Sequence, residues 1–453
     1  SRRDFIKKSA QVSLAASLFA NWGCSPSQSP SPATRPPNVL LLSLDTTRAD
    51  HLSCYGYPRK TSPTIDLLAE SGVLYRNAIS TSSWTLPAHA SMFTGKFVTS
   101  HGARKYAEGD RTLDEAFGGG EFWSHYRVRT ISQNEVLLPE ILQKAGYSTG
   151  AVVAGPWLKK AFGLHRGFDY HDDDNILGLE RQHKRLGTEV TSRALDWLTT
   201  IGDRPFFLFL NYFDPHVPFS LPENFIRRFD NTPNPGLHAE DQLMYDHEIL
   251  FMDFSIRVLF DTMKQRGLLD NTLIVAIADH GHAYGEHGKF THGETVYQEE
   301  VHVPFIVRYP MGEVAPAVRD EYVQPIDLMP LILNRLELPV PEGVQGSPIE
   351  MITHPILAEV YPSEGESTLG HWQCLVEDGK KFLFNSKGNH ELYDLAADPR
   401  EQRNIIADNP DLAKGMMANL MTHFESLPRP EGAPEPLNVD QSTIEELEAM
   451  GYL

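Results

Sequence analysis

The sequence predicts an α/β fold, with a large mixed but mostly parallel sheet flanked by helices and a small C-terminal antiparallel α+β subdomain. Three runs carry this prediction because they are apolar almost without interruption, at 38–44, 206–212 and 273–278. Such runs are typical of strands buried on both faces, as in a parallel sheet. Near the C-terminal end, two apolar stretches flank Asp378-Gly379, a dipeptide that favours the tight turn of an antiparallel hairpin.

The segments between these runs predict the covering layers. We expect helices over 62–72, 189–201, 245–266 and 324–333, a helix followed by a strand over 137–155, and another strand over 304–309. The stretch 104–133 is polar, aromatic and rich in glycine. We therefore expect a loop insertion there, near the mouth of a ligand site, where it is a candidate for determining substrate specificity.

Composition restricts the classes of partner. The chain has 453 residues and a formal net charge of -20, which argues against nucleic acid as a main partner. Its three cysteines, at positions 24, 54 and 374, are too few for a disulfide framework. They also lack the spacing of a zinc-binding motif.

The N-terminal segment has the pattern of an export signal. Arg2-Arg3 is similar to a twin-arginine signal, and the apolar stretch 10–20 has the length of a signal core rather than of a membrane span. Cys24 then follows as a candidate lipidated residue. We expect export to the periplasm or cell surface, with membrane contact only through a lipid anchor at Cys24; the alternative is a soluble secreted protein cleaved nearby.

Polar residues that can do chemistry follow each of the three apolar runs. Asp45 follows the first, Asp214-Pro215-His216 the second and Asp279-His280 the third. In open α/β sheets, ligands bind beyond the carboxyl ends of the strands. We therefore expect these side chains to lie near one another, and carboxylates combined with imidazole are typical ligands of a divalent metal.

The stretch 85–95 predicts a short helix with a functional N-terminus. Pro87 suits the first turn, Thr85 lies at or beside the N-cap, and Gly95 is a natural end. A hydroxyl at a helix N-terminus lies among free N–H groups, in a setting that attracts anions. His89 is four residues on and lies on the same face. A plain capping threonine with a surface histidine is the alternative.

The same stretch, Thr-Leu-Pro-Ala-His-Ala-Ser-Met-Phe-Thr-Gly, resembles the signature of the sulfatase branch of the alkaline phosphatase superfamily. Sulfatases have Cys or Ser at the position of Thr85 and Arg at that of His89. Further segments are similar to family motifs, at 45–57, 214–219, 279–281, 292–297 and 391–404. The resemblance implies an alkaline phosphatase-like fold. It also implies four regions, namely a signal (1–24), a Ser/Pro-rich linker (25–37), a catalytic domain (38–350) and a C-terminal subdomain (351–453).

The resemblance also implies roles for individual residues. It implies one divalent metal ion held by Asp45, Thr85, Asp279 and His280. Zinc or manganese is favoured over calcium because the set includes imidazole and because Thr46 stands where the family often has a second acid.

The remaining roles concern the reacting ester. His89 would orient or deprotonate Thr85, whereas His216 and His292 would contact the ester oxygens or protonate the leaving group. Lys289 is a further candidate for binding the substrate anion. The substrate would be a small-molecule, glycan or lipid ester.

Threonine at the nucleophile position changes the expected chemistry. In sulfatases the Cys or Ser is oxidised to formylglycine, whereas oxidation of threonine would give a ketone. Threonine is the nucleophile in the related phosphoglycerol and phosphoethanolamine transferases. We therefore expect a hydrolase of sulfate or phosphate esters, with phosphate monoesters or diesters preferred. The alternatives are a transferase of that type and a non-catalytic metal-binding homologue.

Overall fold

The structure, a computed structural model, describes residues 35–105, 111–112, 127–174, 185–222, 225, 229, 239–361 and 370–430. Residues from Pro37 onward form one compact unit. The predicted signal, Cys24 and nearly all of the predicted linker lie outside the described residues. No helix in the described part of the chain combines the length and apolar character needed to cross a bilayer.

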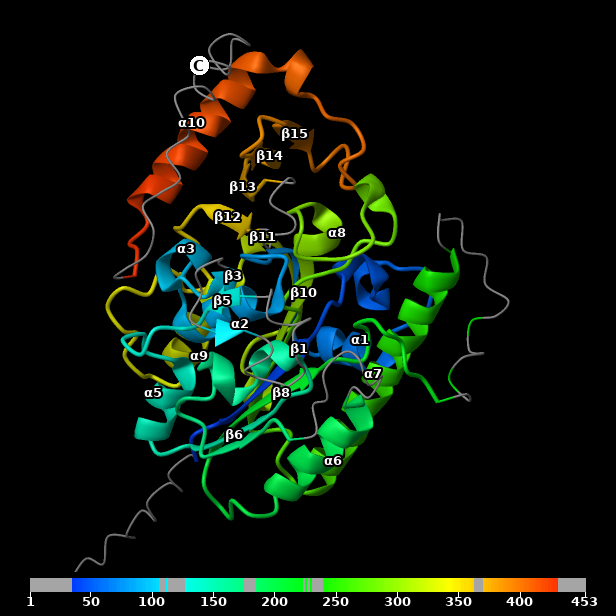
Figure 1. Cartoon of the computed structure of the whole chain (residues 1–453). Coiled ribbons are helices and arrows are strands. Elements are labelled where there is room, and N and C mark those ends of the chain that lie inside the picture. Colours follow the sequence, from blue (N-terminus) through cyan, green and yellow to red (C-terminus); the bar gives the residue numbers. More distant parts are fainter. Residues whose placement is uncertain are drawn as a thin grey trace, which may run out of the picture. The chain divides into compact units, whose positions relative to one another are not determined.

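One large sheet carries the fold (Figure 1). Its strand order is β11-β2-β10-β9-β1-β8-β6-β7. Only β10 runs antiparallel to its neighbours. In chain order the strands are β1 (Asn38–Leu44), β2 (Val73–Ile79), β6 (Ser148–Val152), β7 (Tyr170–Asp172), β8 (Phe206–Tyr212), β9 (Thr272–Ile277), β10 (His302–Arg308) and β11 (Ala317–Val323). The predicted fold class is confirmed.

The apolar runs are explained by helices on both faces of this sheet. Every residue of β1 is buried, and β1 lies between β8 and β9. One face is covered by α1 (Pro63–Glu70), α6 (Gly187–Trp197) and α7 (Ala239–Gln265). The other is covered by α2 (Thr85–Thr94), α5 (Leu138–Lys144) and α9 (Leu328–Arg335), with α3 (Val98–His101) beside α2.

The predicted helices differ from the structure in their bounds: the helix predicted over 189–201 is α6, which ends at Trp197, and two others differ more. Helix α7 begins six residues earlier than the predicted start at 245. The predicted helix 324–333 is divided into a 3-10 turn at Pro325–Asp327 and α9. The predicted loop 104–133 contains a small sheet of β3 (Arg104–Lys105), β4 (Arg111–Thr112) and β5 (Arg127–Arg129); the rest of it lies outside the described residues.

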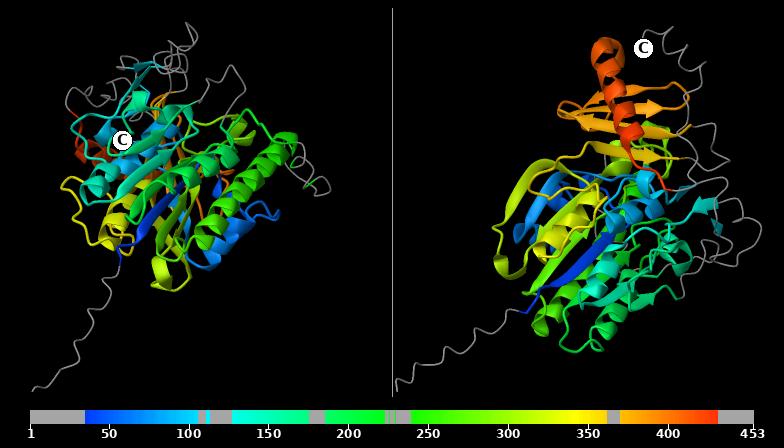
Figure 2. Two further views of the ribbon diagram at one scale, coloured as in Figure 1. Left: turned by 90° about the horizontal axis from the view of Figure 1, so that it is seen from below. Right: turned by 90° about the vertical axis from the view of Figure 1, so that its left-hand side faces the viewer.

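A separate antiparallel sheet forms the C-terminal part. It consists of β12 (Ile356–Val360), β13 (Trp372–Glu377), β14 (Lys380–Asn385) and β15 (Glu391–Asp394), with α10 (Pro410–Ser426) packed along it (Figure 2). Asp378 and Gly379 both have positive φ, at 50° and 72°, as the predicted hairpin turn between β13 and β14 requires.

A fully buried ion pair lies under this small sheet. Lys381 Nζ is 2.8 Å from Glu401 Oε1, and both side chains are 0% exposed. The Oε2 atom of Glu401 accepts a hydrogen bond from the backbone N–H of Gln298, at the start of the short helix α8 (Gln298–Val301). The pair therefore ties β14 to the segment that precedes β10.

Replacing Lys381 with methionine should destabilise the protein, because Glu401 would remain buried without its counter-charge. We expect a loss of about 3–5 kcal/mol in the free energy of unfolding, measured by urea denaturation. The control is Lys380→Met, which removes a partly exposed lysine paired with Asp394 and should leave the urea midpoint close to that of the wild type. Equal losses in the two variants would contradict this assignment.

Candidate active site

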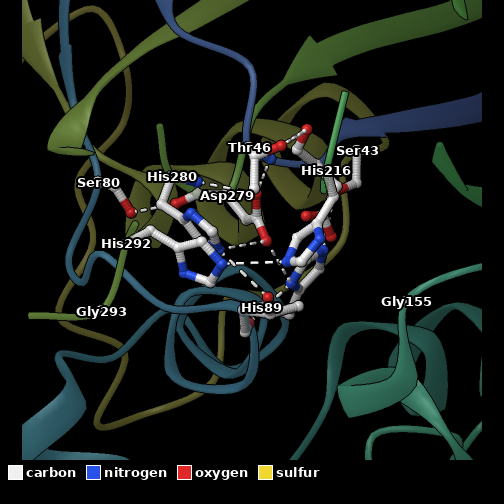
Figure 3. A network of polar contacts seen from close by, with 12 residues as sticks. Ser43, Thr46, Ser80, His89, Gly155, His216, Asp279, His280, His292 and Gly293 are labelled. Carbon is white, nitrogen blue, oxygen red and sulfur yellow. Dashed lines mark hydrogen bonds and ion pairs between the residues drawn. The ribbon is translucent and has the colours of Figure 1, made fainter. Parts of the chain in front are cut away.

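Five of the predicted site residues lie close together in Figure 3, namely His89, His216, Asp279, His280 and His292. Asp45 follows β1, His216 lies shortly after β8, and Asp279 and His280 follow β9. Thr85 is the first residue of α2. Strands β1, β8 and β9 are parallel neighbours, so their carboxyl ends bring together residues separated by more than two hundred positions.

Three of these residues fit a divalent cation. Asp45, Asp279 and His280 each offer one ligand atom, these atoms lie within 4.8 Å of one another, and all three residues are buried. Asp279 Oδ1 accepts hydrogen bonds from the backbone N–H groups of Thr46 and His280, at 3.2 and 2.8 Å. Its Oδ2 accepts no hydrogen bond from any residue that the structure describes. Burial raises the pKa of Asp279, so a cation would stabilise its charged form.

Thr46 does not join this cluster, although its position in the sequence adjoins Asp45. Its hydroxyl donates to the backbone carbonyl of Asp45 at 2.8 Å, and its φ of 53° places it in the left-handed region. This conformation is unusual for a β-branched residue. It directs the backbone N–H of Thr46 at Asp279, so Thr46 contributes a backbone donor where the family often has an acid.

Thr85 lies beside the carboxylate cluster. Trp84 is extended and caps α2, which makes Thr85 the first helical residue, and Gly95 ends the helix with a φ of 65°. Thr85 is 1% exposed, and its Oγ1 is 3.2 Å from His280 Nε2. The sequence thus predicted both the helix and the placement of Thr85 correctly.

Three histidines have their tautomers fixed by backbone carbonyls. The Nδ1 atoms of His89 and His280 lie 2.8 and 2.9 Å from the carbonyls of Thr85 and Gly281, and His216 Nδ1 contacts the carbonyl of Val217. A carbonyl only accepts hydrogen bonds, so each Nδ1 carries the proton and each Nε2 presents a lone pair. Thr85 therefore donates its hydroxyl proton toward His280 Nε2.

His89 orients Thr85 through the backbone. Its Nδ1 donates to the Thr85 carbonyl, and its Nε2 accepts from the Ser43 hydroxyl at 2.8 Å. Its Nδ1 also lies 3.5 Å from Asp279 Oδ2. Neither ring nitrogen makes a hydrogen bond to the Thr85 hydroxyl. These contacts favour the orienting role of His89 over the predicted role of a base, and burial lowers its pKa so that the ring is neutral.

His216 and His292, the two residues predicted to contact the ester, form a pair. Their Nε2 atoms are 3.0 Å apart, and because His216 presents a lone pair, His292 carries its proton on Nε2 and donates. The His292 ring also lies 4.3 Å from the His280 ring, measured between centroids. Burial, followed by the charges of neighbouring groups, places the pKa of His292 well below its usual value, so this ring is neutral.

The predicted Lys289 does not reach this pair in the described contacts. The Nζ atom of Lys289 lies 3.0 Å from Glu294 Oε2, so Lys289 forms an ion pair with Glu294 rather than a contact with either histidine. Lys105 lies closer to the site. Its Nζ is 5.3 Å from the centroid of the Trp84 ring and would be 3.6 Å from a Cβ atom on Gly293, and its charge contributes to the lowered pKa of His292. Sequence reasoning missed Lys105, because it only placed the stretch 104–133 near the site mouth.

Asn211 was also missed. It lies in β8 and is 0% exposed, and its Nδ2 donates to Asp45 Oδ2 at 3.2 Å. A single polar residue inside the apolar run 206–212 is a signal that could have identified it, because a buried amide needs hydrogen-bond partners.

The chain is similar to known proteins in both sequence and fold. A family model described as "Sulfatase" matches residues 37–338, and one described as "N-sulphoglucosamine sulphohydrolase, C-terminal" matches residues 285–427. The chain is 25% identical over 420 residues to the uncharacterized sulfatase YidJ of Escherichia coli, covering 82% of this chain and 83% of YidJ. It is 25% identical over 442 residues to an arylsulfatase of Clostridium perfringens, covering 82% of this chain and 90% of that one.

Solved structures share the fold at lower identity. The phosphonate monoester hydrolase of Agrobacterium radiobacter superimposes with a TM-score of 0.67 at 19% identity, covering 85% of this chain and 95% of that one. A structure determined in complex with D-glucosamine-2-N,6-O-disulfate superimposes with a TM-score of 0.68 at 19% identity, covering 88% and 100%. Since the sulfatase model matches well over half of the chain, the protein belongs to the sulfatase family, a family of ester hydrolases.

Proposed function

We propose that this protein is a metal-dependent hydrolase of phosphate esters in which Thr85 is the nucleophile. The observation that carries the proposal is the position of the Thr85 hydroxyl, 3.2 Å from His280 Nε2 and buried beside the carboxylates of Asp45 and Asp279. The residues that would hold the metal are Asp45, Asp279, His280 and Thr85. When bound, a divalent cation lowers the pKa of a hydroxyl and polarises an ester oxygen.

The chain's own residues then divide the chemistry. Thr85 Oγ1 loses its proton and attacks phosphorus, the bond from phosphorus to the leaving oxygen breaks, and the proton lost by Thr85 is balanced by the proton that the leaving oxygen gains. His89 holds the first turn of α2 in place through the Thr85 carbonyl. His292 carries its proton on Nε2 and donates it to His216 in this structure. When an ester is bound, an ester oxygen would take the place of His216 as the acceptor of this hydrogen bond. Water then attacks the phosphothreonine, which releases phosphate and regenerates the hydroxyl.

The preference for phosphorus follows from threonine itself. A formylglycine hydrate can expel sulfate unaided, whereas a sulfated or phosphorylated threonine must be released by an external nucleophile. The fold is compatible with phosphorus esters, since it is shared by a phosphonate monoester hydrolase. Sulfate esters are the second candidate substrate, because the two relatives described above are named as a sulfatase and an arylsulfatase.

Replacing Thr85 with alanine should abolish turnover, by at least about a thousandfold, because the reaction loses its nucleophile. Aryl phosphodiester, aryl phosphate and aryl sulfate should be compared after metal removal and separate return of zinc, manganese or calcium. Thr94→Ala is the control, since Thr94 lies at the other end of the same helix, where its hydroxyl donates to the Ala90 carbonyl and accepts from the backbone N–H of Lys96. Unchanged turnover in Thr85→Ala would exclude this nucleophile.

The same assays separate the alternatives. A preference for the sulfate ester would overturn the proposed phosphate preference. Phosphorylation of an added alcohol would identify a transferase. Bound metal without turnover of any ester would identify a non-catalytic homologue.

Lys105, rather than Lys289, should contribute to binding the substrate anion. Lys105→Ala should raise KM by about tenfold, because it removes a positive charge beside His292 and Gly293. Lys289→Ala should change KM little, because Lys289 is paired with Glu294. Steady-state kinetics on the preferred ester tests both variants, and the reverse order of effects would restore the sequence-based assignment of Lys289.

A further inference from the structure

Two polar side chains lie opposite each other inside the large sheet. Ser43 on β1 is paired in register with Asn211 on β8, and both are 0% exposed. Apart from Asn38 at the start of β1 and Tyr212 at the end of β8, the other residues of their strands are apolar. A buried polar group is costly unless its hydrogen bonds are made. Each side chain is directed at a site residue, since Ser43 binds His89 Nε2 and Asn211 binds Asp45 Oδ2.

The Asn211 amide has one defined orientation. Its Oδ1 accepts hydrogen bonds from the backbone N–H groups of Ala154 and Gly155, at 3.1 and 2.7 Å. These donors fix which end of the amide is oxygen, so Nδ2 must face Asp45 and donate to Oδ2.

The backbone of Gly155 also approaches this pair closely. A Cβ atom there would lie 3.1 Å from Asn211 Oδ1 and 3.4 Å from Asp45 Oδ2. The backbone of residue 155 therefore approaches the Asn211–Asp45 pair so closely that a side chain would press against both. Nothing else in the described site requires glycine at this position, because its φ of -79° is ordinary.

We propose that Asn211 is a positioning residue that determines which metal the site selects, by committing Asp45 Oδ2 to a hydrogen bond so that Asp45 offers a cation a single oxygen. This inference rests on the metal site of the proposed function. Asp279 is restricted in the same way, because its Oδ1 accepts two backbone N–H groups. Each carboxylate thus acts through one oxygen.

The resulting donor set is small. It comprises one oxygen from each of two aspartates, His280 Nε2 and the Thr85 hydroxyl, which together give four protein ligand atoms. Zinc is commonly satisfied by four ligands that include imidazole, whereas calcium takes about six to eight oxygens and often a two-oxygen carboxylate. The hydrogen bond from Asn211 therefore weakens calcium binding relative to zinc binding, because it removes one oxygen that calcium could use.

The test is Asn211→Asp in the otherwise intact protein. Aspartate keeps an acceptor for the N–H groups of Ala154 and Gly155, so the fold should hold, and it replaces only the Nδ2 donor with a carboxylate oxygen. We expect the ratio of the calcium to the zinc dissociation constant to fall by at least about tenfold. Equilibrium dialysis of the chelator-stripped protein against each metal measures the two constants without any assay of turnover.

Asn38→Asp is the matched control. Asn38 is also a buried asparagine of the large sheet, but it lies at the opposite end of β1, where it contacts Thr272 and the N–H of Phe206. Its substitution should leave the ratio unchanged. A ratio that stays constant in Asn211→Asp, or moves equally in both variants, would overturn the proposal.

A second variant guards against misfolding of the first. Gly155→Ala should weaken zinc binding by about tenfold, because the added Cβ displaces Asn211 or Asp45. Gly415→Ala, in open space on α10, should not affect binding. Unaltered zinc affinity in Gly155→Ala would count against the positioning role. A wild-type protein that binds none of the metals would overturn this inference and the proposed function together. If the wild type binds metal but Asn211→Asp leaves the ratio of the two dissociation constants unchanged, only this inference fails, and the assignment of Thr85 as the nucleophile stands.

Discussion

Two carboxylates buried in close proximity are the constraint on which the site depends. Asp45 and Asp279 are both 0% exposed at the ends of the adjacent strands β1 and β9. Burial penalises each negative charge, and proximity adds mutual repulsion. Hydrogen-bond donors offset part of this cost, namely Asn211 at Asp45 and two backbone N–H groups at Asp279. A divalent cation would offset the remainder, which explains why the sheet can end in two acids.

The histidines around this cluster follow a different electrostatic rule. His89, His216 and His280 each donate Nδ1–H to a carbonyl, which leaves a lone pair on Nε2. Burial lowers the pKa of His280 to about 4, so this ring is neutral near pH 7. Neutral imidazoles can act as ligands and hydrogen-bond partners without adding positive charge beside a cation. Burial lowers the pKa of His89 and His292 as well, so these three buried rings are unprotonated.

Residue pattern predicted the sheet and the convergence of Asp45, Thr85, Asp279 and His280, because strand ends and helix starts are local features of sequence. It did not predict which lysine lies near His292. Lys289 is close in sequence, but Glu294 pairs with it, and Lys105 reaches the site only through the small sheet β3–β5–β4. Nor did it predict Asn211, whose role depends on Ala154 and Gly155, more than fifty residues away. Such tertiary partners have no fixed spacing that a sequence pattern could reveal.

The C-terminal sheet contributes to the site through the segment that carries His292. His287 donates Nδ1–H to Glu299 at 2.6 Å and Nε2–H to the Glu401 carbonyl at 2.8 Å, and its ring stacks on Tyr297 with centroids 3.8 Å apart. Both nitrogens donate, so this ring is an imidazolium. Burial alone would lower its pKa, but Glu299 outweighs burial and raises the pKa to about 9.

This charged histidine contrasts with the neutral ones of the site. His287 donates to the backbone carbonyl of Glu401, and the side-chain carboxylate of Glu401 forms an ion pair with the buried Lys381 of β14. A few residues further on, Glu300 accepts the backbone N–H of Gly293, directly after His292. The loop from His287 to Gly293 is therefore held at both ends by buried acids, Glu299 and Glu300. The small sheet supports this loop indirectly, because Lys381 of β14 holds the Glu401 side chain and the backbone carbonyl of Glu401 accepts from His287.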